Sequence, residues 1–249
     1  MNKLDTYLSL CAEVYDLRRP TPPKDAYEFY RSYIKNAEGL ILEPMCGSGR
    51  FLLPLIEEGF DIQGFDASPH MLKRLCHKAE VKNLKPNVWN GFIEDLTKPE
   101  RYALIFIPSG SFCLIIDQEA VKSALKIFYD HLAEDGILLF ESDTINTAPT
   151  TGIWGGSKWS REDGKMIIFS TCTTLKDNIC SSIGRYELID NNKIICTEIE
   201  ELKFRLYNQD ELTILLHSVG FREVRAIKTF NKDRSPDEDD EIVIFECKK

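Results

Sequence analysis

The sequence lacks long apolar runs and an excess of positive charge. No stretch approaches the ~18 apolar residues that a membrane-spanning helix needs, and Asp5, Glu13 and Asp16 interrupt any apolar core of a secretory signal. The 249 residues include 40 acidic and 31 basic side chains, which give a net charge of −9. Such a surface repels phosphate backbones. We therefore expect a cytoplasmic protein that binds neither membranes nor nucleic acids.

Motifs for metal ions and disulfides are also lacking. The four histidines are scattered, and the eight cysteines include no C-x-x-C pair. Most of the cysteines stand inside apolar segments, so free and mostly buried thiols are expected, and no metal site. The cysteines are Cys11, Cys46, Cys76, Cys113, Cys172, Cys180, Cys196 and Cys247.

The apolar pattern predicts helices and strands in alternation. Two helical stretches, about 4–15 and 25–37, stand on either side of a proline-rich break at 20–23. From residue 39 onward, short apolar runs that are typical of buried strands alternate with amphipathic segments. Repeated units of this kind predict a parallel sheet with helices on both faces. The expected strands span 39–43, 61–66, 87–89, 103–107 and 137–141.

Residues 143–206 break this rhythm. They contain four β-rich runs, at 157–160, 165–175, 179–189 and 193–206, which are separated by turn signals such as Asp163-Gly164. We interpret them as an antiparallel meander inserted after the fifth strand. The earlier pattern then resumes with a helix that Asn208 begins and Gly220 ends, and with strands at 224–227 and 241–247.

Two segments carry the chemistry. The loop Glu43-Pro44-Met45-Cys46-Gly47-Ser48-Gly49-Arg50 follows the first strand of the sheet, and its glycines allow close approach of a ligand to the backbone. Asp66 ends the next strand, where a carboxylate can accept hydrogen bonds from ribose hydroxyls. A nucleoside-containing cofactor is therefore expected. Leu52 stands where a nicotinamide site has its third glycine, and the acid Glu43 disfavours a pyrophosphate, so a cofactor with an ammonium and a sulfonium is favoured.

These segments resemble two motifs of the class I S-adenosylmethionine-dependent methyltransferases. The stretch Leu40-Ile41-Leu42-Glu43-Pro44-Met45-Cys46-Gly47-Ser48-Gly49-Arg50 is similar to motif I, and Gly64-Phe65-Asp66-Ala67-Ser68-Pro69-His70-Met71-Leu72 is similar to motif II. The long β insertion resembles the small-molecule branch, which includes sugar-amine and glycine N-methyltransferases.

The resemblance implies a fold and a domain division. The fold is an α/β, Rossmann-like, doubly wound sheet of seven mostly parallel strands with an antiparallel final strand, together with a small antiparallel β lid. Residues 1–142 and 207–249 would form the cofactor-binding domain, with a helical cap at 1–37. Residues 143–206 would form the inserted lid, which serves the substrate or dimerisation.

The resemblance also implies roles for single residues. Motif I would surround the methionine part of S-adenosylmethionine, Asp66 would hold the ribose, and Ala67 and Met71 would pack near the adenine. The loop at 91–95 corresponds to a segment that contacts adenine, and the segment at 107–112 corresponds to one beside the transferring methyl. The cofactor-binding set is Tyr15, Arg19, Glu43, Met45, Cys46, Gly47, Gly49, Asp66, Ala67, Met71, Phe92, Ile93, Glu94, Pro108 and Ser109.

Two residues depart from the family pattern. Met45 replaces the usual first glycine of motif I, and Phe92 stands where an Asp commonly contacts the adenine amine. Both departures put individual contacts in doubt rather than the cofactor, because Gly47, Gly49 and Asp66 are all present.

The expected activity is transfer of a methyl group from S-adenosylmethionine to a nitrogen or oxygen of a small molecule, by in-line displacement, with S-adenosylhomocysteine as the product. Glu141 and Asp143, at the end of the fifth strand, are candidate bases. The sequence leaves the acceptor open, and also whether the chain is a monomer or a homodimer. A non-catalytic regulatory or partner subunit that binds the cofactor is the alternative, and a nicotinamide oxidoreductase is a weaker one.

Overall fold

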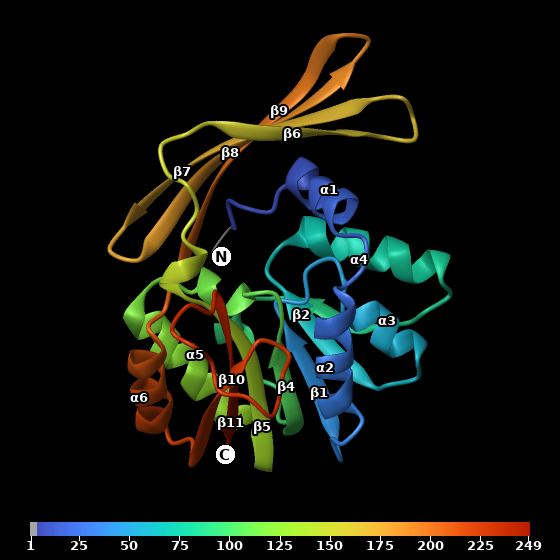
Figure 1. The fold of residues 1–249 in the computed structure, drawn as a ribbon. Helices are drawn as coiled ribbons and strands as arrows, with labels where there is room; N and C mark the ends of the chain where they lie inside the picture. Colours follow the sequence, from blue (N-terminus) through green and yellow to red (C-terminus); the bar gives the residue numbers. More distant parts are fainter. Residues whose placement is uncertain (1–3) are drawn as a thin grey trace.

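The computed structural model describes residues 4–249 and contains two separate β-sheets (Figure 1). The larger sheet has seven strands in the order β10-β11-β5-β4-β1-β2-β3. All neighbouring pairs are parallel except those of β11, which runs antiparallel to both β5 and β10. The predicted mostly parallel sheet with an antiparallel final strand is confirmed. Its strands are β1 (Leu40–Pro44), β2 (Ile62–Asp66), β3 (Asn87–Asn90), β4 (Tyr102–Ile107), β5 (Leu132–Asp143), β10 (Glu223–Lys228) and β11 (Ile242–Lys248).

Helices cover both faces of this sheet, as predicted. One face packs against α2 (Lys24–Ile34), α3 (Leu52–Glu57) and α4 (Pro69–Val81). The other packs against α5 (Gln118–His131) and α6 (Gln209–Val219). Short 3₁₀ turns lie at η1 (Ile93–Asp95), η2 (Ser111–Leu114) and η3 (Ile145–Thr147). No helix in residues 4–249 is long and apolar enough to cross a membrane.

Local capping signals begin these helices where the sequence indicates. The Ser68 hydroxyl accepts a hydrogen bond from the amide of Met71 at 3.2 Å, and Pro69 stands at the first helical position of α4. The Asn208 side chain accepts from the amides of Asp210 and Glu211 at the start of α6. Gly220 ends that helix with a φ of 125°. The boundaries of these two helices therefore follow from the local sequence.

The N-terminal helix departs from its prediction. The helix α1 (Ser9–Arg18) begins at Ser9 rather than near Leu4. Residues 4–8 are irregular, and Tyr7 has a left-handed backbone with a φ of 54°. Tertiary contacts of this segment, described below, account for the difference. The first residues of the predicted cap at 1–37 lie outside the described part of the chain.

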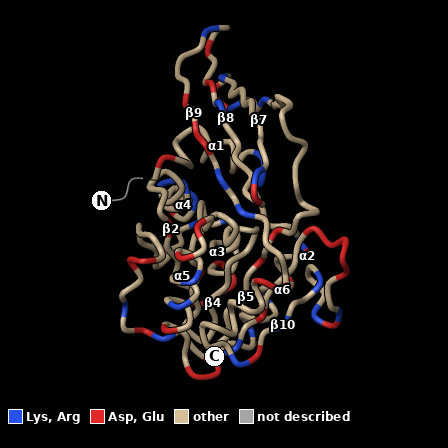
Figure 2. The backbone as a smooth tube through the Cα atoms, turned by 90° about the vertical axis from the view of Figure 1, so that its left-hand side faces the viewer, with Lys and Arg blue, Asp and Glu red and all other residues tan. Residues whose placement is uncertain are grey.

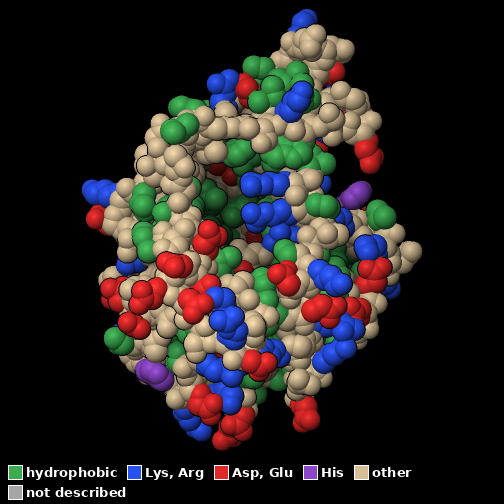
Figure 3. Space-filling model, in the orientation of Figure 1, with side chains coloured by type: hydrophobic (Ala, Val, Ile, Leu, Met, Phe, Trp, Pro, Cys, Tyr) green, Lys and Arg blue, Asp and Glu red, His purple; other side chains and the backbone are tan. Residues whose placement is uncertain are grey.

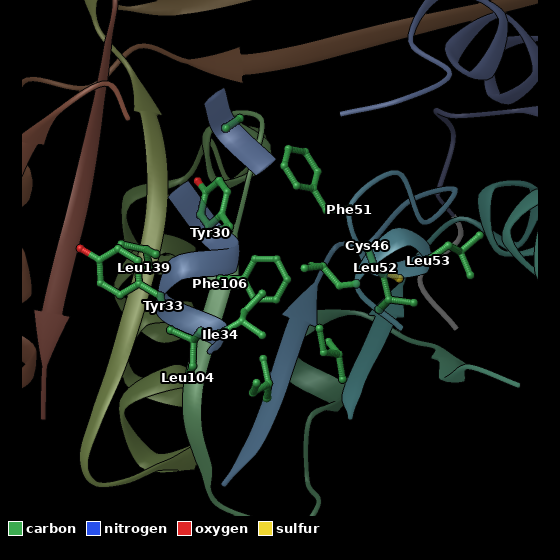
Figure 4. Packing of buried hydrophobic residues seen from close by; sticks show 14 of the residues in the cluster. Tyr30, Tyr33, Ile34, Cys46, Phe51, Leu52, Leu53, Leu104, Phe106 and Leu139 are labelled. Carbon is green, nitrogen blue, oxygen red and sulfur yellow. The ribbon is translucent and has the colours of Figure 1, made fainter. Parts of the chain in front are cut away.

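Helix α2 supplies large aromatic side chains to the core. In Figure 4, Tyr30, Tyr33 and Ile34 lie against Leu104, Phe106 and Leu139 of the sheet. The Tyr30 ring centroid is 5.6 Å from those of both Phe51 and Phe106. Such aromatic contacts stabilise the core beyond simple burial of area. They also fix the Tyr30 hydroxyl near the end of β5.

The second sheet lies beyond the carboxyl ends of the parallel strands (Figure 1). It contains β6 (Gly155–Ser160), β7 (Met166–Lys176), β8 (Ile179–Asp190) and β9 (Lys193–Arg205), paired antiparallel in that order. The predicted meander is therefore confirmed. All four strands fall inside the predicted insertion at 143–206, although the function of this insertion stays a prediction.

The cysteines are only partly as expected. All eight are free, but only four are buried, and Cys76 and Cys196 are exposed.

Acidic and basic residues are interleaved along the chain rather than separated into large fields (Figure 2).

Helix α1 is held between the second sheet and the main domain. The two carboxylate oxygens of Glu200 on β9 accept hydrogen bonds from the amides of Tyr7 and Leu8, at 2.7 and 2.8 Å. Glu198 accepts from the amide of Leu10 at 2.7 Å. Carboxylates at a helix N-terminus satisfy its free amides and complement its dipole. Near the other end of α1, Asp16 accepts from the Ser48 hydroxyl and pairs with Arg74 and Lys78 of α4.

We expect the Glu200→Ala variant to loosen the segment before α1. The change leaves the amides of Tyr7 and Leu8 without acceptors, which costs about 1–3 kcal/mol in the free energy of unfolding. Hydrogen exchange should show faster exchange at residues 7–10. The matched control is Glu201→Ala, because Glu201 is exposed on the same strand. Equal exchange in the two variants would contradict this account of how α1 is held.

Candidate functional site

One cavity of about 760 Å³ lies at the carboxyl ends of the parallel strands, beneath the second sheet. Figure 3 shows a hollow between the second sheet and the main domain, with Lys and Arg side chains at its edge. The volume is in the upper part of the ~300–1,000 Å³ range of small-molecule sites. Its position is the one at which open α/β sheets bind ligands.

The cavity brings together most of the residues that the sequence singled out. They come from α1 and the residue after it, from the end of β2 and the first turn of α4, from the loops after β1, β2, β3 and β4, and from the end of β5. The fold therefore collects residues separated by up to 128 positions in the chain onto one surface. Those that line the cavity are Tyr15, Arg19, Met45, Gly47, Asp66, Ala67, Met71, Phe92, Ile93, Glu94, Ser109 and Asp143.

Five of the predicted residues do not line the cavity and are buried behind its wall. A Cβ atom at Gly49, where φ is 78°, would lie 2.9 Å from the Leu75 side chain, so this glycine permits close packing of α4. Cys46 belongs to the hydrophobic core. The five residues are Glu43, Cys46, Gly49, Pro108 and Glu141.

Asp66 ties the loop after β1 to the start of α4. Its two carboxylate oxygens accept hydrogen bonds from the amides of Gly47 and Ser68, both at 2.8 Å. Burial raises the pKa of Asp66, although both hydrogen bonds oppose that shift. Each oxygen of an ionised carboxylate can accept a further bond. The geometry therefore leaves Asp66 able to accept hydrogen bonds from a pair of hydroxyl groups.

Met45 has a left-handed backbone conformation of the kind that favours glycine. Its φ is 56°, close to the 56° of Gly47. A left-handed conformation costs a residue with a side chain roughly 1–2 kcal/mol. The loop thus keeps its glycine-type turn, and the Met45 side chain forms part of the cavity wall.

Phe92 gives the cavity an apolar section in place of an acid. Phe92 and Ile93 line it together with Ile115, Ala124 and Ile127 from η2 and α5. The nearby Asp95 accepts a hydrogen bond from the Phe92 amide at 2.9 Å. This section suits a flat aromatic ring rather than a charged group.

Glu43 and Arg50 are buried and incompletely bonded. The side chains are 2% and 8% exposed, and Glu43 Oε2 and Arg50 Nε have no hydrogen-bond partner. Burial raises the pKa of Glu43 well above its ordinary value, whereas the nearby Arg50 guanidinium lowers it. Buried polar groups are nearly always hydrogen-bonded, so these two atoms retain the capacity to bind a further polar or charged group. An unpaired carboxylate beside the motif I loop fits a cofactor that carries positive charge.

Glu141 and Asp143 occupy different environments. Glu141 is buried, and its Oε1 accepts a hydrogen bond from the Tyr30 hydroxyl at 2.8 Å. Asp143 lines the cavity, and burial raises its pKa to about 6, while Arg19 lowers it. A Cβ atom at Gly110 would lie 3.1 Å from Asp143 Oδ1, so the absent side chain leaves room for this carboxylate. Of the two candidate bases, only Asp143 reaches the cavity.

Sequence reasoning missed part of the cavity wall. Sequence reasoning also missed Arg50, which lies behind this wall; it directly follows the glycine pair, which could have singled it out, and its Nη2 donates a hydrogen bond to the Ser109 hydroxyl. On β9, alternation would have placed Leu202 and Phe204 on the face of Glu200. The irregular segment before α1 gave no signal. The remaining missed residues are mainly Leu4, Thr6, Tyr7, Lys203 and side chains from η2 and α5. No cluster of three or more His, Cys, Asp or Glu side chains that could hold a metal ion occurs within residues 4–249.

Comparison with known proteins gives a consistent result. The family "Methyltransferase domain" matches residues 41–136. A methyltransferase of Geobacillus sp. (strain WCH70), named without an acceptor, is 24% identical over 94% of this chain and 96% of its own length. The glycine/sarcosine N-methyltransferase of Aphanothece halophytica is 23% identical over 85% of this chain and 77% of its own.

A solved structure shares the fold over the whole chain. The amino pentose methyltransferase CalS10 of Micromonospora echinaspora, solved with S-adenosylmethionine bound, superposes with a TM-score of 0.70. It is 15% identical, and the match covers 100% of both chains. The family match spans the motif I loop and Asp66, the relatives extend along most of the chain, and the sheet is the predicted mostly parallel one with an antiparallel final strand. The cofactor is thus S-adenosylmethionine, and residues 41–136 form the methyltransferase domain of an S-adenosylmethionine-dependent methyltransferase.

Proposed function

We propose that the protein methylates the nitrogen of a small amine and that Asp143 receives the proton. The observation that carries this proposal is the position of Asp143 on the cavity wall beside Ser109 and Gly110, with a pKa of about 6. S-adenosylmethionine supplies a methyl group already activated by its positive sulfur. The protein has to position the nucleophile and accept a proton.

The pKa of Asp143 favours nitrogen over oxygen as the attacked atom. The ammonium form of a lysine-like amine has a pKa of about 10.4, which is much closer to the pKa of about 6 of Asp143 than the pKa of a hydroxyl group is. Water, by contrast, has a pKa of ~15.7, and an alcohol is similarly weak as an acid. A carboxylate with a pKa of about 6 is a poor base for a hydroxyl group. It is well suited to an ammonium group that must become a neutral nucleophile.

The cavity wall supports a division of roles among the remaining residues. Asp66 holds the ribose through the carboxylate oxygens that also bind Gly47 and Ser68, and Ala67, Met71, Phe92 and Ile93 enclose the adenine. Tyr15 and Arg19 close over the methionine part, beside the motif I loop. Glu141 orients Tyr30 and the Ser109 loop and takes no proton from the acceptor.

The second sheet serves as the lid over the acceptor in this proposal. Residues 202–204 of β9 line the cavity, and Glu198 and Glu200 on the same strand hold the segment before α1. The helix α1, which covers the cofactor in this proposal, is therefore attached to the sheet that covers the acceptor. This arrangement excludes water from the site of methyl transfer.

A panel of matched acceptors tests the choice of nitrogen. We expect methylation of small amines, such as amino sugars and amino acids. Counterparts with a hydroxyl in place of the amine should be methylated at least about 100-fold more slowly. Product formation is followed by mass spectrometry. Turnover confined to the hydroxyl compounds would contradict the proposal. Cofactor binding without turnover across the panel would instead favour a non-catalytic subunit.

A further inference from the structure

Three buried charged side chains lie behind the cavity wall. Glu43, Arg50 and Glu141 are 2%, 8% and 3% exposed. None of them takes part in an ion pair within 4.0 Å among residues 4–249. When all three are ionised, this buried charge set carries one excess negative charge.

The hydrogen bonds of this set are unevenly distributed. Glu141 Oε1 accepts a hydrogen bond from the Tyr30 hydroxyl, and the backbone of Ser109 lowers the pKa of Glu141 against the effect of burial. Arg50 donates to the Ser109 hydroxyl, but its Nε has no partner. Glu43 Oε2 has no partner either. A buried charge without partners is strongly destabilising, so Glu43 is the member that most needs an additional cation.

The set borders the part of the cavity formed by Tyr15, Met45 and Ser109. The Arg50 guanidinium carbon lies 5.4 Å from the centroid of the Tyr15 ring. Glu43 stands two residues before Met45 and is near enough to raise the pKa of Tyr15. These wall residues belong to the motif I loop and to the segments around it, where the methionine part of the cofactor is proposed to bind.

We propose that this buried charge set makes the protein bind S-adenosylmethionine more tightly than S-adenosylhomocysteine, with Glu43 supplying the discriminating charge. During transfer the bond from sulfur to methyl breaks, its electron pair stays on sulfur, and the new bond forms to the acceptor nitrogen. The positive charge thus leaves the cofactor with the methyl group. The product keeps its ammonium but no longer has the sulfonium, so one of the two positive charges opposite the buried excess negative charge is lost, which weakens retention of the product.

The ionisation of Glu43 should be coupled to this discrimination. The titratable and charged groups near Glu43 are Arg50 and Cys46 after β1, Asp66 on β2, Tyr15 on α1 and Tyr30 on α2. Burial favours the protonated form of Glu43, and a bound cation favours the ionised form. Binding of the sulfonium form therefore releases a proton, and its affinity rises with pH below the raised pKa. The affinity for S-adenosylhomocysteine should change much less with pH.

Calorimetric titration of the full chain tests this inference. We expect the wild type to bind S-adenosylmethionine about tenfold more tightly than S-adenosylhomocysteine, a difference of about 1.4 kcal/mol. Titrations in two buffers of different ionisation enthalpy should show more proton release with the sulfonium form. An analogue in which an amine-bearing carbon replaces the sulfonium keeps the charge and should behave like S-adenosylmethionine.

The Glu43→Gln variant isolates the charge. It should bind S-adenosylmethionine about tenfold more weakly, keep its affinity for S-adenosylhomocysteine within about threefold, and lose the difference in proton release. Glu57→Gln, at an exposed carboxylate on α3 that pairs with Lys82, is the matched control. Equal affinity of the wild type for both ligands would overturn the inference, and so would equal weakening of both in Glu43→Gln. No acceptor is needed, so a wrong assignment of nitrogen as the attacked atom leaves this test unaffected.

Discussion

The Asp66→Ala variant is expected to bind S-adenosylhomocysteine at least about 100-fold more weakly than the wild type. The change removes the proposed acceptor of the ribose hydroxyls. It also removes the acceptor of the Gly47 and Ser68 amides, each held at 2.8 Å. Hydrogen bonds to a charged group are each worth about 1.5–3 kcal/mol, and about 2.7 kcal/mol corresponds to 100-fold in affinity. Calorimetry measures the loss directly.

A matched control separates the site from general destabilisation. Asp61 stands just before β2, at the opposite end of the strand from Asp66, and is exposed. Asp61→Ala should leave the affinity for S-adenosylhomocysteine unchanged. Binding by Asp66→Ala within about threefold of the wild type would show that the cofactor occupies a different part of the cavity.

The Asp143→Asn variant is expected to lower the rate of methyl transfer by about 10²–10⁴-fold, the usual contribution of a positioned base. Because the pKa of Asp143 is about 6, kcat/KM of the wild type should rise as the pH passes that value, while the carboxylate becomes ionised. Asparagine is nearly isosteric and cannot accept the proton, so the variant should lack this limb of the pH profile. Initial rates between pH 5 and 9 measure both effects.

Two further measurements exclude a structural cause. Burial raises the pKa of Asp143 in the folded protein, so the folded state binds more protons than the unfolded state between the two pKa values, and stability falls as the pH rises through that window. Asparagine removes this destabilising charge, and Asp143→Asn should therefore melt no lower than the wild type at pH 8. Glu141→Gln should retain the pH limb, because Glu141 lies behind the wall. Loss of the limb in Glu141→Gln alone would transfer the base role to Glu141.

Much of the fold is readable from local sequence. Strand and helix periods, the caps at Ser68 and Asn208 and the turn signals of the meander act over a few residues, and the structure places these elements within a few positions of their prediction. The predicted start of the first helix was wrong because residues 4–8 are not governed by local periodicity. The acceptors of the Tyr7 and Leu8 amides lie on Glu200, 193 and 192 positions away.

The candidate site divides in the same way. Glycine and acid spacing indicated the motif I loop and Asp66 because their chemistry depends on adjacent residues and on two consecutive strands. Glu141 and Asp143, in contrast, share one face of β5 by the period of a strand, so the sequence could not separate them.

The sequence by itself indicated the methyltransferase motifs, the cofactor and the order of the elements, since these depend on short motifs and local periods. Only the tertiary structure decided which acid faces the cavity. Tyr30, 111 positions before Glu141, covers that carboxylate and leaves Asp143 open. The structure likewise brought the unpaired charges of Glu43 and Arg50 behind one wall, since burial and partners are properties of the packed chain and not of any segment of it.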